Sequence, residues 1–303
     1  MIAAVTGARG MIGWHLIQSL RAKGFEVRAL SRKGQPCSDD ITLIQGDIND
    51  RKALLQLLDG VTSIFHCAAE LNDEAIMFNV NVKGTQTLLE SMRKTPTIQY
   101  FCHMSSAGVV GPTSDLIVDE KTSCKPNNAY EKSKYEAEQL VLNANLAMNV
   151  CILRPTNVFD VTKPSILNYA MKGSFKDKVS VFIKGHEGAH LVHAKDVAEA
   201  ALFFMDKTFK KPNVFFVSYD DDIRNTVLGA YNVCVSKQGS EKLKLPFALP
   251  SFIPYFIRKI KQGKSLHGRV RFSEKKLRDA GFIFPLGLEK AVSDVCSKGA
   301  SER

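Results

Sequence analysis

Two side chains near the middle of the chain have the types and the spacing for acid–base chemistry. Tyr130 and Lys134 are four residues apart in a strongly helical pattern that follows Asn127 and Asn128, either of which could cap a helix, so they lie on one helical face. The pKa of a phenol is about 10, and a neighbouring ammonium group lowers that pKa because it favours the phenolate. Tyr130 could therefore exchange a proton with a substrate oxygen at neutral pH.

A serine follows the apolar run at 98–104, which predicts a strand. This residue is Ser106, and Ser105 is the alternative for the same role. A hydroxyl at the end of a strand could hydrogen-bond the substrate oxygen and stabilise the charge that develops on it. The sequence thus predicts a centre at which a hydroxyl or carbonyl oxygen loses or gains a proton.

A glycine-rich loop near the beginning of the chain predicts a partner for this proton transfer. Residues 6–13 read Thr-Gly-Ala-Arg-Gly-Met-Ile-Gly and lie between an apolar run at 2–5 and a helical pattern at 11–23. Glycines in such a loop allow a sharp turn, a close approach of backbone to a pyrophosphate and close packing of helix on sheet, and the helix N-terminus attracts phosphate. We therefore expect a nicotinamide dinucleotide, which would exchange a hydride with the substrate carbon.

The end of the second predicted strand bears on the choice between the two nicotinamide cofactors. NAD sites usually have an acidic residue there, which binds the ribose 2′-hydroxyl. This chain instead has Arg32, with Ser31, Lys33 and Arg9 as possible helpers around a 2′-phosphate. We predict that NADP is preferred and keep NAD as the alternative.

The elements that must position these residues alternate between strand and helix. We expect strands near 2–5, 25–30, 41–45, 62–67, 98–104, 149–153 and 213–217, and helices near 11–23, 51–58, 74–94, 128–147 and 195–207. This order predicts an α/β fold with a doubly wound parallel sheet, and the continuous apolar strands fit a sheet covered on both faces. After Arg154-Pro155 the elements become shorter, which indicates a smaller lobe.

Composition places the chain among ordinary globular proteins. It has 303 residues, of which 45% are hydrophobic and 24% charged. The seven cysteines form no C-x-x-C pair and several lie in apolar runs, so we expect reduced, buried thiols. No signal peptide opens the chain and no apolar run reaches the roughly 18 residues of a membrane span, so we expect a cytoplasmic protein.

The formal net charge of +10 suits a phosphate-rich ligand. Basic residues do not alternate with stacking aromatic residues, so we expect no nucleic acid. His186, His190 and His193 are interrupted by glycines in a turn, so we expect no metal site.

Together these motifs resemble the extended short-chain dehydrogenase/reductase family, also called the NAD-dependent epimerase/dehydratase family. The resemblance covers roughly residues 1–205 and, more loosely, the C-terminal end. Its further motifs are Gly46-Asp47-Ile48, His66-Cys67-Ala68-Ala69, Asn81-Val82-Lys83-Gly84-Thr85, Leu153-Arg154-Pro155 and Val192-His193-Ala194-Lys195-Asp196-Val197.

The resemblance implies roles for residues and for whole elements. It implies a Rossmann domain at 1–157 and a mainly substrate-binding lobe at 158–303, with 191–217 returning to the main sheet. It also implies a homodimer formed through the helices near 74–94 and 128–147. The implied catalytic residues are Ser106, Tyr130 and Lys134. The implied cofactor residues are Gly7, Arg9, Gly10, Met11, Ile12, Gly13, Arg32, Asp47, Ile48, Ala68, Ala69, Asn81, Tyr130, Lys134 and Pro155.

The expected substrate follows from positions at which this chain keeps or departs from the family pattern. Ser106 is followed by Ala107 and Gly108 in place of the acidic pair of the dehydratases, so dehydration is not expected. Asn157 resembles an asparagine that binds the diphosphate of nucleotide sugars, whereas Ala189 stands where those members often have arginine. We predict a nucleotide-linked sugar, reduced, oxidised or epimerised. The predicted substrate residues are Ser106, Asn157, Arg269 and Arg271.

Two alternatives remain open. The first is an alcohol dehydrogenase or ketone reductase for a steroid-like or flavonol-like molecule, with a pocket lined by Phe247, Phe252, Tyr255 and Phe256. The second is a non-catalytic protein that binds NADP, although the chain keeps its catalytic residues. The apolar and basic segment 247–264 most simply predicts a packed helix, and peripheral membrane contact is a less favoured interpretation.

Overall fold

The computed structural model describes residues 1–32, 40–239, 245–250, 268 and 270–301. Lys33, Phe252, Tyr255, Phe256, Arg269 and most of segment 247–264, all named above, lie outside the described residues.

The chain forms two compact units. The first consists of Met1–Gly111, Pro126–Arg154 and Val197–Phe215, and the second of Pro112–Lys125, Pro155–Asp196 and Phe216–Arg303. Besides the expected division near residue 157, the second unit thus includes 112–125.

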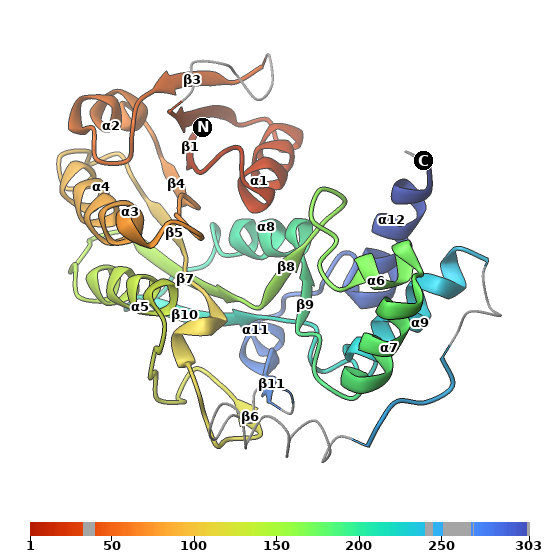
Figure 1. The fold of residues 1–303 in the computed structure, drawn as a ribbon. Coiled ribbons are helices and arrows are strands. Elements are labelled where there is room, and N and C mark those ends of the chain that lie inside the picture. The colour runs from red at the N-terminus through yellow and green to blue at the C-terminus, as the bar shows by residue number, and fades with distance from the viewer. Residues whose placement is uncertain (33–39, 240–244, 251–267, 269, 302–303) are drawn as a thin grey trace. The chain divides into compact units, whose positions relative to one another are not determined.

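A seven-stranded sheet carries the glycine loop and the predicted catalytic serine (Figure 1). Its strands, in sheet order, are β10 (Asn213–Val217), β7 (Asn149–Pro155), β5 (Tyr100–Met104), β4 (Ser63–His66), β1 (Ile2–Thr6), β2 (Glu26–Ser31) and β3 (Thr42–Gln45). All pairs from β7 to β3 are parallel. The strands β4 and β5 are buried along their whole length, as expected for strands covered on both faces. The predicted doubly wound α/β fold is therefore confirmed.

Helices of the first unit pack apolar faces on this sheet. They are α1 (Met11–Ala22), α2 (Arg51–Leu58), α3 (Glu74–Phe78), α4 (Gly84–Met92) and α5 (Ala129–Leu142), while α8 (Ala194–Phe203) spans the boundary of the two units. Leu54, Leu57 and Leu58 of α2 and Leu88 of α4 belong to one buried core.

Two helix predictions differ from the structure. The helix expected at 74–94 is interrupted by a π-helical turn at Asn79–Lys83, and the helix expected at 128–147 ends at Leu142. A π-helical turn adds a residue to the helical repeat and is common at functional sites. Here it includes Asn81.

The second unit contains two short parallel sheets and five described helices. The strand β6 (Ile117–Val118) pairs with β11 (Arg271–Phe272), and β8 (Asn157–Phe159) pairs with β9 (Leu191–His193). The helices are α6 (Leu167–Lys172), α7 (Phe175–Lys184), α9 (Val227–Lys237), α11 (Lys275–Asp279) and α12 (Gly287–Ser301). Residues 191–217 were expected to return to the main sheet, but only their strand β10 joins it, because β9 pairs with β8.

The motif at 192–197 has a structural purpose within the second unit. The fully buried carboxylate of Asp196 accepts a hydrogen bond from the Tyr219 hydroxyl at 2.6 Å and from the Gly287 amide at 3.0 Å. Gly287 is the first residue of α12, so Asp196 neutralises the positive end of that helix. The acidic residue of the motif thus fixes the C-terminal helix.

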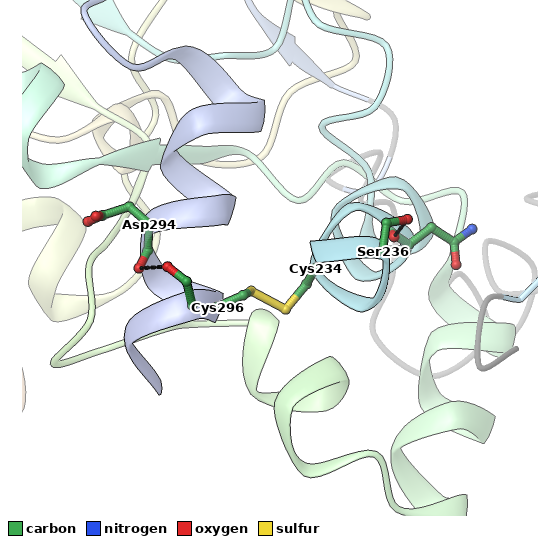
Figure 2. The surroundings of a disulfide bond; sticks show 6 residues. Cys234, Ser236, Asp294 and Cys296 are labelled. Atoms are coloured by element: carbon green, nitrogen blue, oxygen red, sulfur yellow. Dashed lines mark hydrogen bonds between the residues drawn. A yellow bond between two sulfur atoms is a disulfide. The ribbon is translucent and has the colours of Figure 1, made fainter. Parts of the chain in front are cut away.

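A disulfide corrects the expectation that all cysteines are reduced. Cys234 on α9 and Cys296 on α12 are bonded, with Cα atoms 5.8 Å apart (Figure 2). The two residues are 62 positions apart, so their spacing in the sequence gave no sign of pairing. Cys102 and Cys151 are buried and form no disulfide, as expected.

No helix in the described part of the chain is both long enough and apolar enough to cross a membrane.

Candidate active site

The helix α5 begins where the sequence predicts it. The side chain of Asn128 caps it by accepting a hydrogen bond from the Glu131 amide at 2.8 Å, and the Glu131 carboxylate accepts one from the Asn127 amide at 2.8 Å. This reciprocal cap fixes the first turn of the helix. Tyr130 and Lys134 follow, one turn apart, on the side of α5 that faces the sheet.

Tyr130 and Ser106 meet at the carboxyl end of β5. The Tyr130 and Ser106 side chains are close enough to influence each other, and the Ser106 hydroxyl accepts a hydrogen bond from the Gly108 amide at 3.1 Å. Burial raises the pKa of Tyr130, and the interaction with the Ser106 side chain partly opposes this rise. In the protein alone Tyr130 therefore carries its proton at neutral pH, ready to donate it.

Ser105, the alternative serine, makes different contacts from Ser106. Its hydroxyl donates a hydrogen bond of 2.6 Å to the fully buried carboxylate of Glu138. Arg154 reaches the same carboxylate with two hydrogen bonds, of 3.0 and 2.5 Å. Ser105 thus belongs to a buried ionic network that ties β5 and β7 to α5, and Ser106 is the serine beside Tyr130.

Lys134 is buried below the end of β5. Its side chain is 3% exposed and its ammonium donates a hydrogen bond to the Met104 carbonyl. Burial lowers the pKa of Lys134 to about 8, and the nearby Cys67 and Glu138 act in the opposite direction. Lys134 is therefore still mainly cationic at neutral pH.

The glycine loop is a tight crossing of backbone, as predicted. A Cβ atom on Gly13 would lie 2.2 Å from the Gly7 carbonyl oxygen, and one on Gly7 would lie 2.6 Å from the Ala68 nitrogen. Gly10 precedes α1 and supplies no side-chain cap. The first amides of α1 therefore keep unsatisfied donors, which is the arrangement that binds phosphate.

A cleft of about 480 Å³ lies above this loop, entirely within the first unit. Eight predicted cofactor residues line it: Gly7, Arg9, Gly10, Arg32, Asp47, Ile48, Ala68 and Ala69. Met11, Ile12, Gly13, Asn81, Tyr130, Lys134 and Pro155 are not among its lining residues. Gly13 and Asn81 act behind the cleft, and Pro155 is the buried last residue of β7.

The sequence reasoning missed Glu70 and Cys67, which also line the cleft. One carboxylate oxygen of Glu70 accepts hydrogen bonds from the amides of the three residues that follow it, at 3.0, 3.0 and 3.2 Å. These bonds, with a contribution from the charge of Arg32, lower the pKa of Glu70. A fixed negative charge thus shares the cleft with Arg32. The signal in the sequence was only its place directly after the His66–Ala69 motif.

Asn81 connects the cleft to the catalytic helix. Its side-chain carbonyl oxygen accepts a hydrogen bond from the Glu70 backbone amide at 2.7 Å. Its amide group donates to the Glu70 carbonyl at 3.0 Å and to the Ser133 hydroxyl at 2.9 Å. Ser133 lies between Tyr130 and Lys134 and donates to the Tyr130 carbonyl at 2.8 Å. Asn81 therefore fixes the position of the cleft wall relative to α5.

The rest of the Asn81–Thr85 motif supports the same region. A Cβ atom on Gly84 would lie 2.5 Å from a methyl group of Ile48, so only glycine lets this cleft residue pack so closely. Thr85 donates to the Asn81 carbonyl at 2.6 Å and accepts from His66 Nε2 at 3.0 Å.

His66 is held in one neutral tautomer by its two neighbours. Because the Thr85 hydroxyl already donates elsewhere, His66 Nε2 must donate to it. His66 Nδ1 then accepts from the Thr6 hydroxyl at 2.7 Å. Burial lowers the pKa of His66 to about 3, and the charge of Lys134 adds to this effect. The histidine thus serves as a neutral bridge from Thr6 of β1 to Thr85 of α4.

Of the predicted substrate residues, Ser106 lies in the first unit, and Asn157 and Arg271 lie in the second. Asn157 donates its side-chain amide to the Ala189 carbonyl at 2.8 Å, and its backbone amide donates to the His190 carbonyl at 2.7 Å. His190 Nδ1 and the Asp220 carboxylate are 2.6 Å apart. Arg271 donates to the Asp220 carbonyl at 3.0 Å. The structure thus places Asn157 and Arg271 around one His190–Asp220 pair.

The fold and the site define a dinucleotide-binding protein of the doubly wound α/β class, with a serine, tyrosine and lysine set beside the sheet. Residues 3–218 match the model of the NAD dependent epimerase/dehydratase family, and the chain belongs to that family. The residues that line the cleft above the glycine loop all lie within the matched part of the chain.

Solved structures share the fold over the whole chain. The UDP-glucose 4-epimerase of Thermotoga maritima, solved with UDP-glucose, is 19% identical with a TM-score of 0.78 and covers 100% of this chain and 99% of its own. A short-chain dehydrogenase/reductase superfamily protein from Agrobacterium tumefaciens, solved with NAD, is 19% identical with a TM-score of 0.76 and covers 100% and 98%.

Curated relatives are more similar in sequence but over less of their length. "Sterol demethylase protein B" of Methylococcus capsulatus is 28% identical over 68% of this chain and 66% of its own. The "3 beta-hydroxysteroid dehydrogenase/Delta 5-->4-isomerase" of Monkeypox virus is 34% identical over 52% of each chain. The chain thus spans about two thirds and about half of the length of these two relatives.

Proposed function

We propose that this protein is an NAD(P)-dependent oxidoreductase that moves a hydride to or from a carbonyl or secondary alcohol carbon. The observation that carries the proposal is the placement of the Tyr130 and Ser106 hydroxyls beside each other, with the buried ammonium of Lys134 one helical turn from Tyr130. These groups lie in the same unit as the dinucleotide cleft.

When bound, the dinucleotide would supply or accept the hydride. In the direction of reduction, Ser106 binds the carbonyl oxygen and Tyr130 gives that oxygen its proton. The raised pKa of Tyr130 suits this direction because the hydroxyl is protonated at neutral pH. Lys134 remains cationic and favours the tyrosinate that is left behind. In the direction of oxidation, the same tyrosinate would take the proton of the alcohol.

For the cofactor, we infer a preference for NADP over NAD. Arg32 follows β2, lines the cleft and is exposed there, and no acidic side chain stands at the end of β2. A guanidinium suits a 2′-phosphate through charge and paired hydrogen bonds. The Glu70 carboxylate, which lines the same cleft, accepts hydrogen bonds from the three backbone amides that follow it.

For the substrate, we infer an apolar secondary alcohol or ketone of the sterol type. Two relatives at 28% and 34% identity are named for sterol or hydroxysteroid chemistry. The side-chain amide of Asn157 is used on the Ala189 carbonyl, and Arg271 is paired with the Asp221 carboxylate at 3.4 Å. Both side chains thus already bind protein groups, which disfavours the binding of a diphosphate by them.

A nucleotide-linked sugar is the second candidate. The structural neighbours solved with UDP-glucose support it, as does the net charge of +10. With this substrate the chain would act as a reductase, a dehydrogenase or an epimerase.

A direct test measures NADPH and NADH absorbance with the purified chain and two substrate panels, ketosteroids and UDP-sugar ketones. We expect turnover of a ketosteroid, and Tyr130→Phe should lower kcat by about 10²- to 10⁴-fold with nearly unchanged dinucleotide affinity. The matched control is Tyr135→Phe, on the same helix. Tight NADP binding without turnover of either panel would refute the enzyme and favour a cofactor-binding module. Turnover of the UDP-sugars alone would refute the sterol-type substrate.

We also propose a homodimer through α4 and α5, whose grooved surface includes Gln86, Glu90 and Gln139. Sedimentation equilibrium tests this, and a monomer at micromolar concentration would refute it.

A further inference from the structure

Helix α7 of the second unit exposes an apolar stripe. Phe175, Val179 and Ile183 are spaced four residues apart and therefore lie on one face. They are 83%, 39% and 40% exposed. Phe182 continues the stripe, and its ring packs against that of Phe247, which is itself 65% exposed, with centroids 6.0 Å apart. Contiguous apolar surface of this kind marks an interaction site.

The other face of α7 explains why the stripe is not needed for folding. Val181 is fully buried on that face, and α7 packs there against α6 and α9. The cap at Ser174, whose hydroxyl accepts the Asp177 amide at 3.2 Å, fixes the start of the helix. The helix is thus held on the second unit by its buried side, while the stripe remains available.

Lysines border the stripe. In the helical repeat of α7, Lys176 and Lys178 lie on its two sides, and Lys184 is the last residue of the helix. Lys172 is the last residue of α6, two residues before the Ser174 cap of α7. In the described part of the chain none of these four lysines forms an ion pair. Asp177, the single acid of α7, receives a hydrogen bond of 2.6 Å from the Ser174 hydroxyl. The surface therefore combines exposed apolar side chains with positive charge.

We propose that this surface, defined as Phe175, Val179, Phe182, Ile183 and Phe247 with the four lysines, docks the protein on an anionic lipid surface. Apolar side chains of such a helix enter the boundary between headgroups and acyl chains, and lysines on either side reach the headgroups with their ammonium groups. Anionic lipids add an electrostatic attraction for each lysine.

A second copy of the chain fits this surface less well. A two-fold contact would bring the same four lysines of each copy together, and like charges repel. A lipid surface with negative headgroups complements the stripe and its border at once. This inference does not depend on the proposed activity.

The test is co-flotation of the purified full-length chain with vesicles of phosphatidylcholine, alone or mixed with phosphatidylserine. We expect binding to the mixed vesicles, weakened by salt. Lys176→Gln with Lys178→Gln should weaken it about 25-fold, since each lysine contributes roughly fivefold. Phe175→Ser with Val179→Ser and Ile183→Ser should weaken it by more than about tenfold.

Matched controls separate this surface from general charge and hydrophobicity. Lys210→Gln with Lys211→Gln removes two exposed lysines from the first unit, and Ile223→Ser with Ile283→Ser removes two apolar side chains that are 86% and 80% exposed. Both controls should bind like the unchanged protein, and all variants should keep its thermal unfolding midpoint. Absence of binding to the mixed vesicles would overturn the proposal. So would equal binding by the stripe variant, or a stripe variant that only changes the oligomeric state.

Discussion

Replacing Asn81 by alanine should loosen the link between the dinucleotide cleft and the catalytic helix. The side chain is 2% exposed and makes three hydrogen bonds, two with the Glu70 backbone and one with the Ser133 hydroxyl. The alanine variant would leave the Glu70 amide and carbonyl without these partners. The main consequence should appear in the cleft wall and not in the core.

The size of the effect follows from the number of bonds lost. Each hydrogen bond contributes about 1 kcal/mol net, and leaving partners buried without a bond costs about as much or more. Three bonds therefore predict a loss of about 3 kcal/mol in the free energy of unfolding for Asn81→Ala. Because Glu70 lines the cleft, dinucleotide affinity should fall as well. A loss of about 1.4 kcal/mol in the free energy of binding corresponds to about a tenfold weaker affinity.

Urea unfolding followed by circular dichroism measures the first quantity, and titration calorimetry with the dinucleotide measures the second. Ser133→Ala is the matched control, because it keeps both bonds to Glu70. It should cost about 1–2 kcal/mol and leave dinucleotide affinity nearly unchanged. The double variant should lose about 1 kcal/mol less than the sum of the single losses, since one bond is shared. A loss below about 1 kcal/mol with unchanged affinity in Asn81→Ala would refute the assigned role.

Three further predictions concern other parts of the molecule. Arg32→Ala should weaken NADP binding by about 10- to 100-fold and NAD binding little in calorimetry; equal effects on both would remove the 2′-phosphate assignment. Reduction of the Cys234–Cys296 disulfide, whose ends are 62 residues apart, should lower the free energy of unfolding by about 4 kcal/mol. Thiol titration of the denatured protein should find two fewer thiols before reduction than after it. Equal numbers would show that the bond does not form. The pKa of Lys134 is lowered to about 8, so between about pH 8 and 10 the unfolded state binds more protons than the folded state. The free energy of unfolding should therefore rise with pH in this range, by up to about 3 kcal/mol. Lys134→Met should lack this rise, and a Lys134→Met variant that keeps it would contradict the burial of the ammonium.

The sequence was most informative where backbone geometry demands a particular residue. Gly7 and Gly13 cross so closely that no other side chain fits, and strands such as β4 are covered on both faces and so read as apolar runs. These constraints act over a few neighbouring residues, which is why the strands of the main sheet and the glycine loop could be predicted. The interrupted helix at 79–83 could not, because a π-helical turn leaves the apolar pattern almost unchanged.

The spacing of residues in the sequence could not predict contacts between residues that are distant along the chain. The separate roles of Ser105 and Ser106 depend on Glu138, which lies a helix away in the chain, and the pairing of Cys234 with Cys296 depends on how α9 and α12 pack. Glu70 was missed because its role comes from its own turn and from the neighbouring cleft, and not from any repeated pattern.

The same reasoning separates the cofactor half of the site from the substrate half. Dinucleotide binding uses backbone amides and glycines, whose function follows from position alone. Substrate choice uses side-chain groups, and an asparagine in a family motif is available to a ligand only where the protein does not already bind it. The side-chain amide of Asn157 donates to the backbone carbonyl of Ala189 at 2.8 Å, and Ala189 itself supplies no positive charge beside it. An asparagine that already binds the protein, next to a side chain without charge, favours the proposed sterol-type substrate over a diphosphate.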